Sequence, residues 1–401
     1  MPGPLHGVRI LDMTGMISGP MATMLLADQG ADVIKIEPPA GDLMRHYGVM
    51  RKGMSSSFLS NNHGKRSLTV DIKAPEGLEI ILKLAATADV LVQNFRPGAI
   101  ERMGLGEDAV RKVKPDIIYV SISGFGEHGP YAMQRVYDPV IQALCGLAEI
   151  QADRETRQPR MVRTVIPDKT TAVTAAQAIS AALFARERTG QGQHVRLAML
   201  DTMVAFLWPE ASSSLSYVGD EADPARGQMG LDLVFKTQDR YITAGAVSDN
   251  EWQGMCRALA RPDLVDDERF KTVADRSRNV VVRRRLMSEE LAKWPSAEIL
   301  AHLQAENVPC APVLSRTELL DDEQVRTNGI IEIHDDPVLG KVRQPRPAAR
   351  FSATPSAVRR LAPYLGAHNA ELLFELGYAA QDIERLTETG VLHAQPPPAG
   401  V

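Results

Sequence analysis

The chain has 401 residues, a length that allows two or three domains of ordinary size. Hydrophobic residues make up 44% of the chain and charged residues 24%, which excludes a disordered or collagen-like protein. The 45 basic and 50 acidic residues give a formal charge of −5, which argues against general nucleic-acid binding.

Two further features bear on the cellular compartment. No apolar run approaches the roughly 18 residues that span a bilayer, and the N-terminal MPGPLHGVRILDM has neither the basic nor the apolar region of a secretory signal. The cysteines, Cys145, Cys256 and Cys310, lie far apart and form no CxxC pair, a pattern typical of reduced thiols. We therefore expect a cytoplasmic enzyme with no membrane segment and no metal site.

In the first 125 residues, short apolar runs that predict strands alternate with helical patterns. The strands are expected at 7–13, 31–37, 88–95 and 115–125, and the helices at 20–30, 75–88 and 106–114. Parallel strands need helical crossovers, so this alternation predicts an α/β fold with a doubly wound, Rossmann-like parallel sheet.

Further along the chain, an alanine-rich segment predicts a long helix. It has Asp168 at its N-cap, runs through the basic turn Arg186–Arg188 and ends at Gly190. A strand is expected at 194–201.

The composition then shifts to Ser, Gly, Asp and Pro around residues 210–230, which indicates a domain boundary. We expect a large α/β domain built from residues 1–220 and 329–401, with a smaller α/β domain at 221–328 inserted between them. Two helices, at 367–378 and 380–390, close the chain.

The first strand–turn–helix invites a dinucleotide-binding interpretation, with Glu37 where a ribose-binding acid would lie. However, the turn Thr14–Pro20 lacks GxGxxG, and Pro20, expected at the first helical position, removes an N–H that would face a pyrophosphate. An ordinary βα turn explains these residues better. A nicotinamide-dependent oxidoreductase stays open as an alternative of another class.

Local strings along nearly the whole chain resemble the family III CoA-transferases, which include 2-methylacyl-CoA racemases. The strings are PLHGVRILDMT, ADVIKIEPPAGD, GKRSLTVDIKAPEG, ADVLVQNFRPGAIERMGLG, SISGFGEHGP, PDKTTAVTAAQAISAALFARERTGQGQ, RPAARFSATP and LGYAAQDIERL. The resemblance implies a large domain from both chain ends, a small domain between them, and a homodimer of interlocked subunits. It also implies acyl-CoA and carboxylic acid substrates, with the CoA thioester as co-substrate and no permanently bound cofactor.

Asp168 is the candidate catalytic residue. From the residues alone it is a helix N-cap, a role that stabilises a helix by about 1 kcal/mol. The resemblance implies that it is a nucleophile, which attacks the acyl-CoA thioester and passes CoA on through mixed anhydrides and an aspartyl-CoA thioester. The two roles do not exclude each other.

The resemblance also implies a set of CoA contacts at strand ends, where doubly wound sheets form ligand crevices. The set is Ile17, Ser18, Val70, Lys73, Asn94, Phe95, Arg96, Arg102, Arg135 and Tyr137. For each basic member, a solvated surface charge is the alternative interpretation. Two positions depart from the pattern of formyl-CoA-using members, which have a glutamine at position 17 and an arginine at position 38, where this chain has Ile17 and Pro38.

A racemase remains the alternative within the same fold. Racemases need an acid/base pair that includes a histidine, and the matching string here is Val136-Tyr137-Asp138, with tyrosine instead. Tyrosine has a pKa near 10 and is a poor base at neutral pH, which favours the transferase. Members that act on formyl-CoA carry a glycine run, for which this chain offers only Gly227 and Gly230. A CoA-binding protein without turnover is a further alternative.

Overall fold

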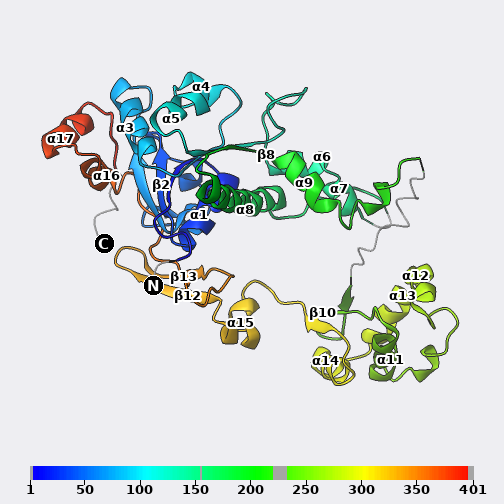
Figure 1. Cartoon of the computed structure of the whole chain (residues 1–401). Coiled ribbons are helices and arrows are strands. Elements are labelled where there is room, and N and C mark those ends of the chain that lie inside the picture. The colour runs from blue at the N-terminus through cyan, green and yellow to red at the C-terminus, as the bar shows by residue number, and fades with distance from the viewer. Residues whose placement is uncertain (1–2, 154–155, 220–232, 396–401) are drawn as a thin grey trace. The chain divides into compact units, whose positions relative to one another are not determined.

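The computed structural model describes residues 3–153, 156–219 and 233–395 (Figure 1). Its contacts divide the chain into two compact units, of which the larger is Met1–Gly227 with Gly329–Val401 and the smaller is Gln228–Asn328. The expected boundary between residues 220 and 221 lies outside the described residues, as do Gly227 and Gly230.

A six-stranded parallel sheet forms the centre of the larger unit. Its strands are β1 (Arg9–Met13), β2 (Asp32–Glu37), β5 (Lys65–Thr69), β6 (Val90–Gln93), β7 (Ile118–Ser123) and β8 (His194–Ala198). They lie in the order β5-β2-β1-β6-β7-β8, and every neighbouring pair is parallel. The chain thus proceeds in one direction from β1 to β5 and in the other from β6 to β8, a doubly wound order. The predicted parallel α/β sheet is confirmed.

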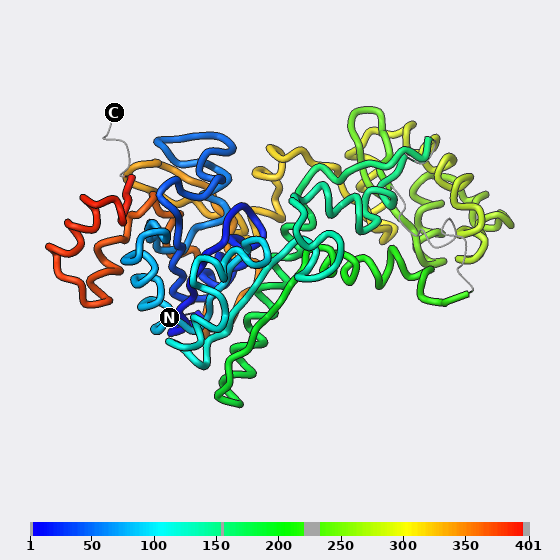
Figure 2. The backbone as a smooth tube through the Cα atoms, turned by 90° about the horizontal axis from the view of Figure 1, so that it is seen from above, coloured from blue at the N-terminus to red at the C-terminus, as the bar shows by residue number. Residues whose placement is uncertain are grey.

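Helices cover both faces of this sheet. Helices α1 (Ser18–Asp28) and α8 (Ile166–Thr189) pack on one face through small and branched apolar side chains. The helices on the other face are α3 (Pro75–Ala86), α5 (Glu107–Val113), α16 (Asn369–Glu375) and α17 (Ala380–Glu388). Figures 1 and 2 show the C-terminal α16 and α17, in red, beside α3. Both ends of the chain therefore build one hydrophobic core.

Shorter elements complete the larger unit. They are η1 (Leu43–His46), β3 (Met50–Arg51), β4 (Met54–Ser55), α2 (Ser56–Asn62), α4 (Ala99–Arg102), α6 (Asp138–Leu144), α7 (Leu147–Ile150), α9 (Met199–Leu207), η2 (Ser213–Leu215), β12 (Ile331–Asp336) and β13 (Gly340–Pro345). The strands β3 and β4 pair with each other, as do β12 and β13, and both pairs are antiparallel. Helices α6, α7 and α9 pack around an apolar cluster of their own that includes Ile166, the first residue of α8.

The smaller unit has a three-stranded antiparallel sheet in the order β11-β10-β9. Its elements are β9 (Val234–Lys236), β10 (Tyr241–Ala244), α11 (Asp249–Ala258), η3 (Pro262–Leu264), α12 (Val273–Arg278), α13 (Val280–Leu291), α14 (Ser296–Ala305), β11 (Cys310–Pro312), η4 (Glu318–Leu320) and α15 (Glu323–Asn328). Trp252, Phe270 and Leu291 lie in a core that this unit forms by itself.

The structure corrects three details of the sequence prediction. Strand β5 is missing from the predicted strands. Its first two residues, Lys65 and Arg66, are charged and interrupt the apolar pattern, although all five of its residues are buried. Helix α1 begins at Ser18, so Pro20 is its third residue and not its first. The helix expected at 367–378 is shorter, because α16 ends at Glu375, two residues before the left-handed Gly377.

Candidate active site

The turn between β1 and α1, residues 14–17, lies at the carboxyl end of the sheet, next to the end of β6. Asn94, which follows β6, accepts a hydrogen bond from Gly15 N–H at 2.9 Å and donates one to Gly15 O at 2.8 Å. Met16 has a φ of 68°, a left-handed conformation that side chains other than glycine rarely adopt, and its N–H donates to Asp42 Oδ1 at 3.2 Å. These contacts fix the turn from two sides.

A cluster of buried charges lies beneath this turn. Lys65 Nζ is 2.7 Å from Asp12 Oδ2, while Lys35 Nζ is 3.0 Å from Asp42 Oδ2 and donates to Thr14 O at 2.9 Å. Asp12, Lys35 and Lys65 are all 0% exposed. Burial by itself raises the pKa of Asp12, but the ammonium groups of Lys65 and Lys35 outweigh burial and hold that pKa well below its ordinary value. Asp12 is therefore ionised at neutral pH.

Asp168 lies in the first turn of α8. It is the third helical residue, after the N-cap Val165, so its predicted N-cap position is wrong. The helix starts earlier because Ile166 and Pro167 occupy its first two positions, where a proline loses no helical hydrogen bond. A carboxylate in the first turn still lies at the positive end of the helix dipole, which favours an anion.

The Asp168 carboxylate is close to the start of α1 as well as to α6. Ser18, the buried first residue of α1, favours the Asp168 anion through its hydroxyl and its backbone N–H. Burial raises the pKa of Asp168, and the negative charge of Asp138 raises it further, to about 6, against the opposing effect of Ser18. At pH 7 most molecules therefore carry an Asp168 anion that is more basic than an ordinary aspartate.

Asp138, the first residue of α6, is only 3% exposed and contacts the start of α8 directly. Its Oδ2 accepts from Asp168 N–H at 3.2 Å, and its Oδ1 accepts from Gln142 Nε2 at 2.6 Å. Gln142 also accepts from Val162 N–H at 2.9 Å and donates to Val162 O at 3.2 Å and to Thr164 O at 3.4 Å. One face of α6 thus holds the segment that leads into α8.

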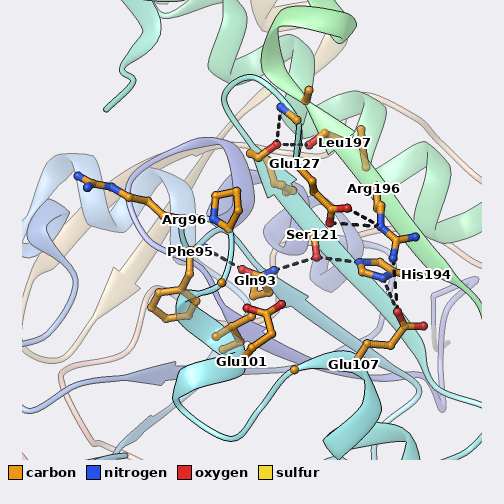
Figure 3. Close-up of a pocket in the computed structure, with 18 of the residues that line it drawn as sticks. Gln93, Phe95, Arg96, Glu101, Glu107, Ser121, Glu127, His194, Arg196 and Leu197 are labelled. Atoms are coloured by element: carbon orange, nitrogen blue, oxygen red, sulfur yellow. Dashed lines mark hydrogen bonds and ion pairs between the residues drawn. The ribbon is translucent and has the colours of Figure 1, made fainter. Parts of the chain in front are cut away.

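A cavity of about 900 Å³ opens along the carboxyl ends of β6, β7 and β8 (Figure 3). Phe95 and Arg96 line one part of it, and residues 126–128 line another. Its charged lining residues are Arg96, Glu101, Glu107, Asp108, Glu127, Arg196 and Asp201. Asn94, which holds the turn before Ser18, directly precedes Phe95. The β1–α1 turn is thus held by the residue that precedes the cavity-lining Phe95.

A row of hydrogen-bonded side chains lines one wall of this cavity (Figure 3). Gln93 Nε2 donates to Ser121 Oγ at 2.8 Å, and Ser121 Oγ is 2.8 Å from His194 Nε2. His194 Nδ1 is in turn 2.5 Å from Glu107 Oε2. The row links β6, β7 and β8 to α5, which gives this wall a fixed shape.

The structure brings together part of the predicted CoA-binding set. Ile17 and Ser18 lie at the start of α1, and Asn94 and Phe95 lie at the end of β6, followed by the exposed Arg96.

The other predicted contact residues differ in their exposure to solvent. Lys73, Arg102, Arg135 and Tyr137 are exposed, the last at 61%. Val70 is only 1% exposed and packs in the core beside Leu392, so its side chain presents no open surface for an adenine.

The geometry argues against two alternative functions, the nicotinamide-dependent oxidoreductase and the racemase. Glu37, the expected ribose-binding acid, is buried and its carboxylate pairs with Arg45 Nη2 at 2.6 Å. Asp138, the acid that a racemase would use, has both of its oxygens engaged by Gln142 and by Asp168 N–H.

Sequence reasoning missed the partners of Asp168. Asp138 was considered only for a racemase, yet it contacts the candidate nucleophile. The available signal was the spacing of Asp138 and Gln142, which follow Tyr137. Residues four positions apart lie on the same face of a helix. No sequence pattern indicates that Asp12, Lys35 and Lys65 form a cluster, because these residues meet only when separate strands pair.

The described part of the chain has neither a cluster of metal-binding side chains nor a membrane-spanning helix. No group of three or more His, Cys, Asp or Glu side chains among residues 3–153, 156–219 and 233–395 could hold a metal ion. No helix within these ranges is both long and apolar enough to cross a membrane.

Known proteins resemble this chain over nearly its full length. The model of CoA-transferase family III matches residues 5–369. The chain is 36% identical to the succinyl-CoA:glutarate CoA-transferase of Mus musculus over 396 residues, which cover 97% of this chain and 90% of the mouse protein. It is 35% identical to the succinyl-CoA:mesaconate CoA-transferase of Haloarcula hispanica over 401 residues, which cover 94% of this chain and 97% of that protein.

A solved structure shows the same likeness. The crystal structure of a CaiB/BaiF family protein from Brucella suis matches with a TM-score of 0.82 at 30% identity, covering 94% of this chain and all of that one. The protein belongs to CoA-transferase family III. It is an enzyme that transfers CoA between acyl-CoA thioesters and carboxylic acids, so the predicted transferase function is confirmed and the oxidoreductase alternative is set aside.

Proposed function

We propose that Asp168 is the nucleophile of this CoA transfer and that the donor is a dicarboxylic acyl-CoA such as succinyl-CoA. The observation that carries the first part is the basic Asp168 anion at the start of α8, which Ser18 at the start of α1 favours. An aspartate with a pKa of about 6 is ionised at neutral pH and is still a better nucleophile than an ordinary aspartate.

The chemistry proceeds by acyl exchange. The Asp168 carboxylate attacks the thioester carbonyl, the C–S bond breaks, and a mixed anhydride and the CoA thiolate form. The thiolate then attacks the Asp168 carbonyl, which releases the donor acid and leaves an aspartyl-CoA thioester. The acceptor carboxylate attacks this thioester to give a second anhydride, and the thiolate attacks its acceptor carbonyl. Acceptor-CoA leaves and the Asp168 carboxylate is restored. Each step exchanges one activated acyl group for another, so no external energy source is required.

The environment of Asp168 suits these steps. The Ser18 N–H and the positive ends of the α1 and α8 helix dipoles favour negative charge on the carboxylate and on the tetrahedral intermediates that form there. CoA would extend from Asp168 past the β1–α1 turn into the cavity, with its sulfur at Asp168 and Phe95 and Arg96 beside its remote part. The exposed Lys73 and Arg102 are candidates for its phosphates.

The substrate class rests on the relatives. Two of them are named for succinyl-CoA and for the dicarboxylic acids glutarate and mesaconate. A dicarboxylic substrate keeps one carboxylate that does not react and needs a cation. Arg135, exposed and just before Asp138 in the chain, is our candidate for this contact.

We also propose that the enzyme is a homodimer, interlocked as the family resemblance implies. Helices α6 and α9 of the larger unit carry the exposed apolar side chains Val140, Leu144, Val204 and Phe206, and Trp208 follows α9. A group of exposed large apolar residues on packed helices is typical of a protein interface. Sedimentation equilibrium should give twice the chain mass, and Phe206→Glu should weaken the dimer. The cytoplasmic location stays a prediction from the sequence.

Mass spectrometry of the trapped intermediate tests the nucleophile. The enzyme is mixed with succinyl-CoA and then treated with hydroxylamine, which converts an aspartyl thioester or anhydride into a hydroxamate. Trypsin should release residues 164–169, a peptide whose one acidic side chain is Asp168. A hydroxamate there supports the proposal, and a hydroxamate on another peptide contradicts it. Transfer to glutarate and mesaconate at a rate no better than to butyrate would contradict the substrate class.

A further inference from the structure

Asp138 and Gln142 form a cradle beneath the start of α8. Both are buried, and they lie one helical turn apart on α6. Between them they make five hydrogen bonds, one with each other and four with the backbone of Val162, Thr164 and Asp168. The bonds reach both the segment before the helix and the N–H of the candidate nucleophile.

We propose that Asp138, oriented by Gln142, is a positioning residue that fixes the Asp168 backbone and keeps its carboxylate reactive. This inference rests on the proposed role of Asp168 as nucleophile. A buried aspartate that merely accepted two hydrogen bonds could be replaced by an uncharged acceptor of the same shape. Here the charge also acts on the neighbouring carboxylate, and no cation among the described residues opposes that effect.

The charged groups around Asp168 support this assignment. Asp138, on α6, is the charged side chain that acts on the pKa of Asp168. Lys169, the next residue of α8, donates instead to Thr164 Oγ1 at 2.9 Å. On α1, the charged Asp28 pairs with His63 at the far end of the helix, and on α9 Asp201 lines the cavity. The negative charge of Asp138 thus opposes ionisation of Asp168 and makes it a stronger base than burial alone would.

Asp138 and Gln142 can affect Asp168 in two ways, through its position and through its charge environment, and the two can be measured independently. Gln142 affects position only, because it is uncharged. Asp138 affects both position and charge. A neutral residue at 138 should therefore change the pH at which Asp168 becomes active, whereas a change at 142 should alter the rate without altering that pH.

The experiment compares pH profiles of kcat/KM for succinyl-CoA in four variants. In Asp138→Asn, the acid limb should move to lower pH by about 0.5–1 unit, and the rate at pH 7.5 should fall by about tenfold to a hundredfold. Asp138→Ser is a second neutral replacement and should show the same direction. Gln142→Leu should lose rate with its acid limb in place. Glu149→Gln, which removes an exposed carboxylate on the neighbouring α7, is the matched control and should resemble wild type.

The hydroxamate assay on residues 164–169 is run on every variant, with folding checked by thermal melting. An acid limb in folded Asp138→Asn or Asp138→Ser that coincides with the wild-type limb overturns this inference, even if the Asp168 hydroxamate forms. Absence of that hydroxamate in the wild-type enzyme instead overturns the nucleophile itself, and with it the inference. A shifted limb together with the hydroxamate supports both.

Discussion

Two carboxylates on either side of the β1–α1 turn, the buried Asp12 and the partly buried Asp168, have opposite electrostatic surroundings. Asp12 lies beneath the turn against Lys65 and Lys35 and accepts a hydrogen bond from Thr23 at 2.8 Å. Asp168 lies beyond the turn, where Ser18 favours its anion and the charged group that acts on it is a second carboxylate. The pKa of Asp12 is held low, and that of Asp168 is raised to about 6.

The two carboxylates therefore have different roles: one stabilises the fold and the other is reactive. A carboxylate that is neutralised by two ammonium groups is a weak base and a poor nucleophile, but it stabilises the fold around it. A carboxylate that lacks such neutralisation destabilises the fold and is more reactive. Four predictions follow from this contrast, in descending order of expected effect.

The largest effect should come from Asp168→Ala, which removes the proposed nucleophile. We expect transfer of CoA from succinyl-CoA to glutarate to fall by at least about 10³-fold, because no other group completes the anhydride steps. A coupled assay of succinyl-CoA consumption measures this. Residual transfer within tenfold of wild type would refute the assignment.

Removal of a cation from Asp12 should harm the fold instead. In Lys65→Met, Asp12 becomes a buried anion with one ammonium fewer, so the free energy of unfolding should fall by about 3–5 kcal/mol. Chemical denaturation measures this loss. The control is Lys83→Met, because Lys83 is exposed and its surface pair with Glu79 is worth about 0–1 kcal/mol. Equal losses in the two variants would mean that the buried cluster has no special role.

The third prediction is a gain in stability. The raised pKa of Asp168 means that its ionised form opposes folding, and this penalty appears as the pH rises through about 6. Asp168→Asn should therefore stabilise the inactive protein at pH 8 by about 1–2 kcal/mol, with the difference vanishing below about pH 4. Denaturation at the two pH values checks the sign. A variant less stable than wild type at pH 8 would contradict a strained Asp168 anion.

The smallest effect should come from Ser18→Ala. The Ser18 hydroxyl favours the Asp168 anion, so its removal should raise the pKa of Asp168 further and move the acid limb of kcat/KM to higher pH by less than about one unit. This shift is opposite in direction to the one expected for Asp138→Asn. Shifts in the same direction in both variants would be inconsistent with the arrangement of charges around Asp168.

The elements that were predictable are those with an apolar pattern. The runs at β1, β2, β6 and β7 indicate buried parallel strands, and the alternation with helices indicates the sheet. Strand β5 could not be predicted in this way, because the charges that mark it as exposed are compensated by distant residues. Lys65 pairs with Asp12, and Arg66 pairs with Glu371 at 2.8 Å, 305 residues further along the chain.

The candidate site shows the same limit. Asp168 could be singled out because helix starts and family strings are local features of a sequence. Its exact helical position depended on how Ile166 and Pro167 enter the first turn. Its contact with Asp138 could not be deduced, because these residues are 30 positions apart and meet only through the packing of α6 on α8. The raised pKa follows from that tertiary contact and from burial.

The return of the C-terminal segment to the first sheet also has a consequence for synthesis. Leu372, Leu373 and Leu386 complete the apolar layer that covers β1, β2 and β5. Arg66, at the outer strand of the sheet, has two of its carboxylate partners on α16. On the ribosome, α3 and α5 can cover part of this face early, but the part that α16 and α17 cover stays exposed until almost the whole chain has emerged. The larger unit therefore cannot finish folding as its N-terminal residues appear, and the smaller unit, whose core is contiguous in sequence, is free to fold first.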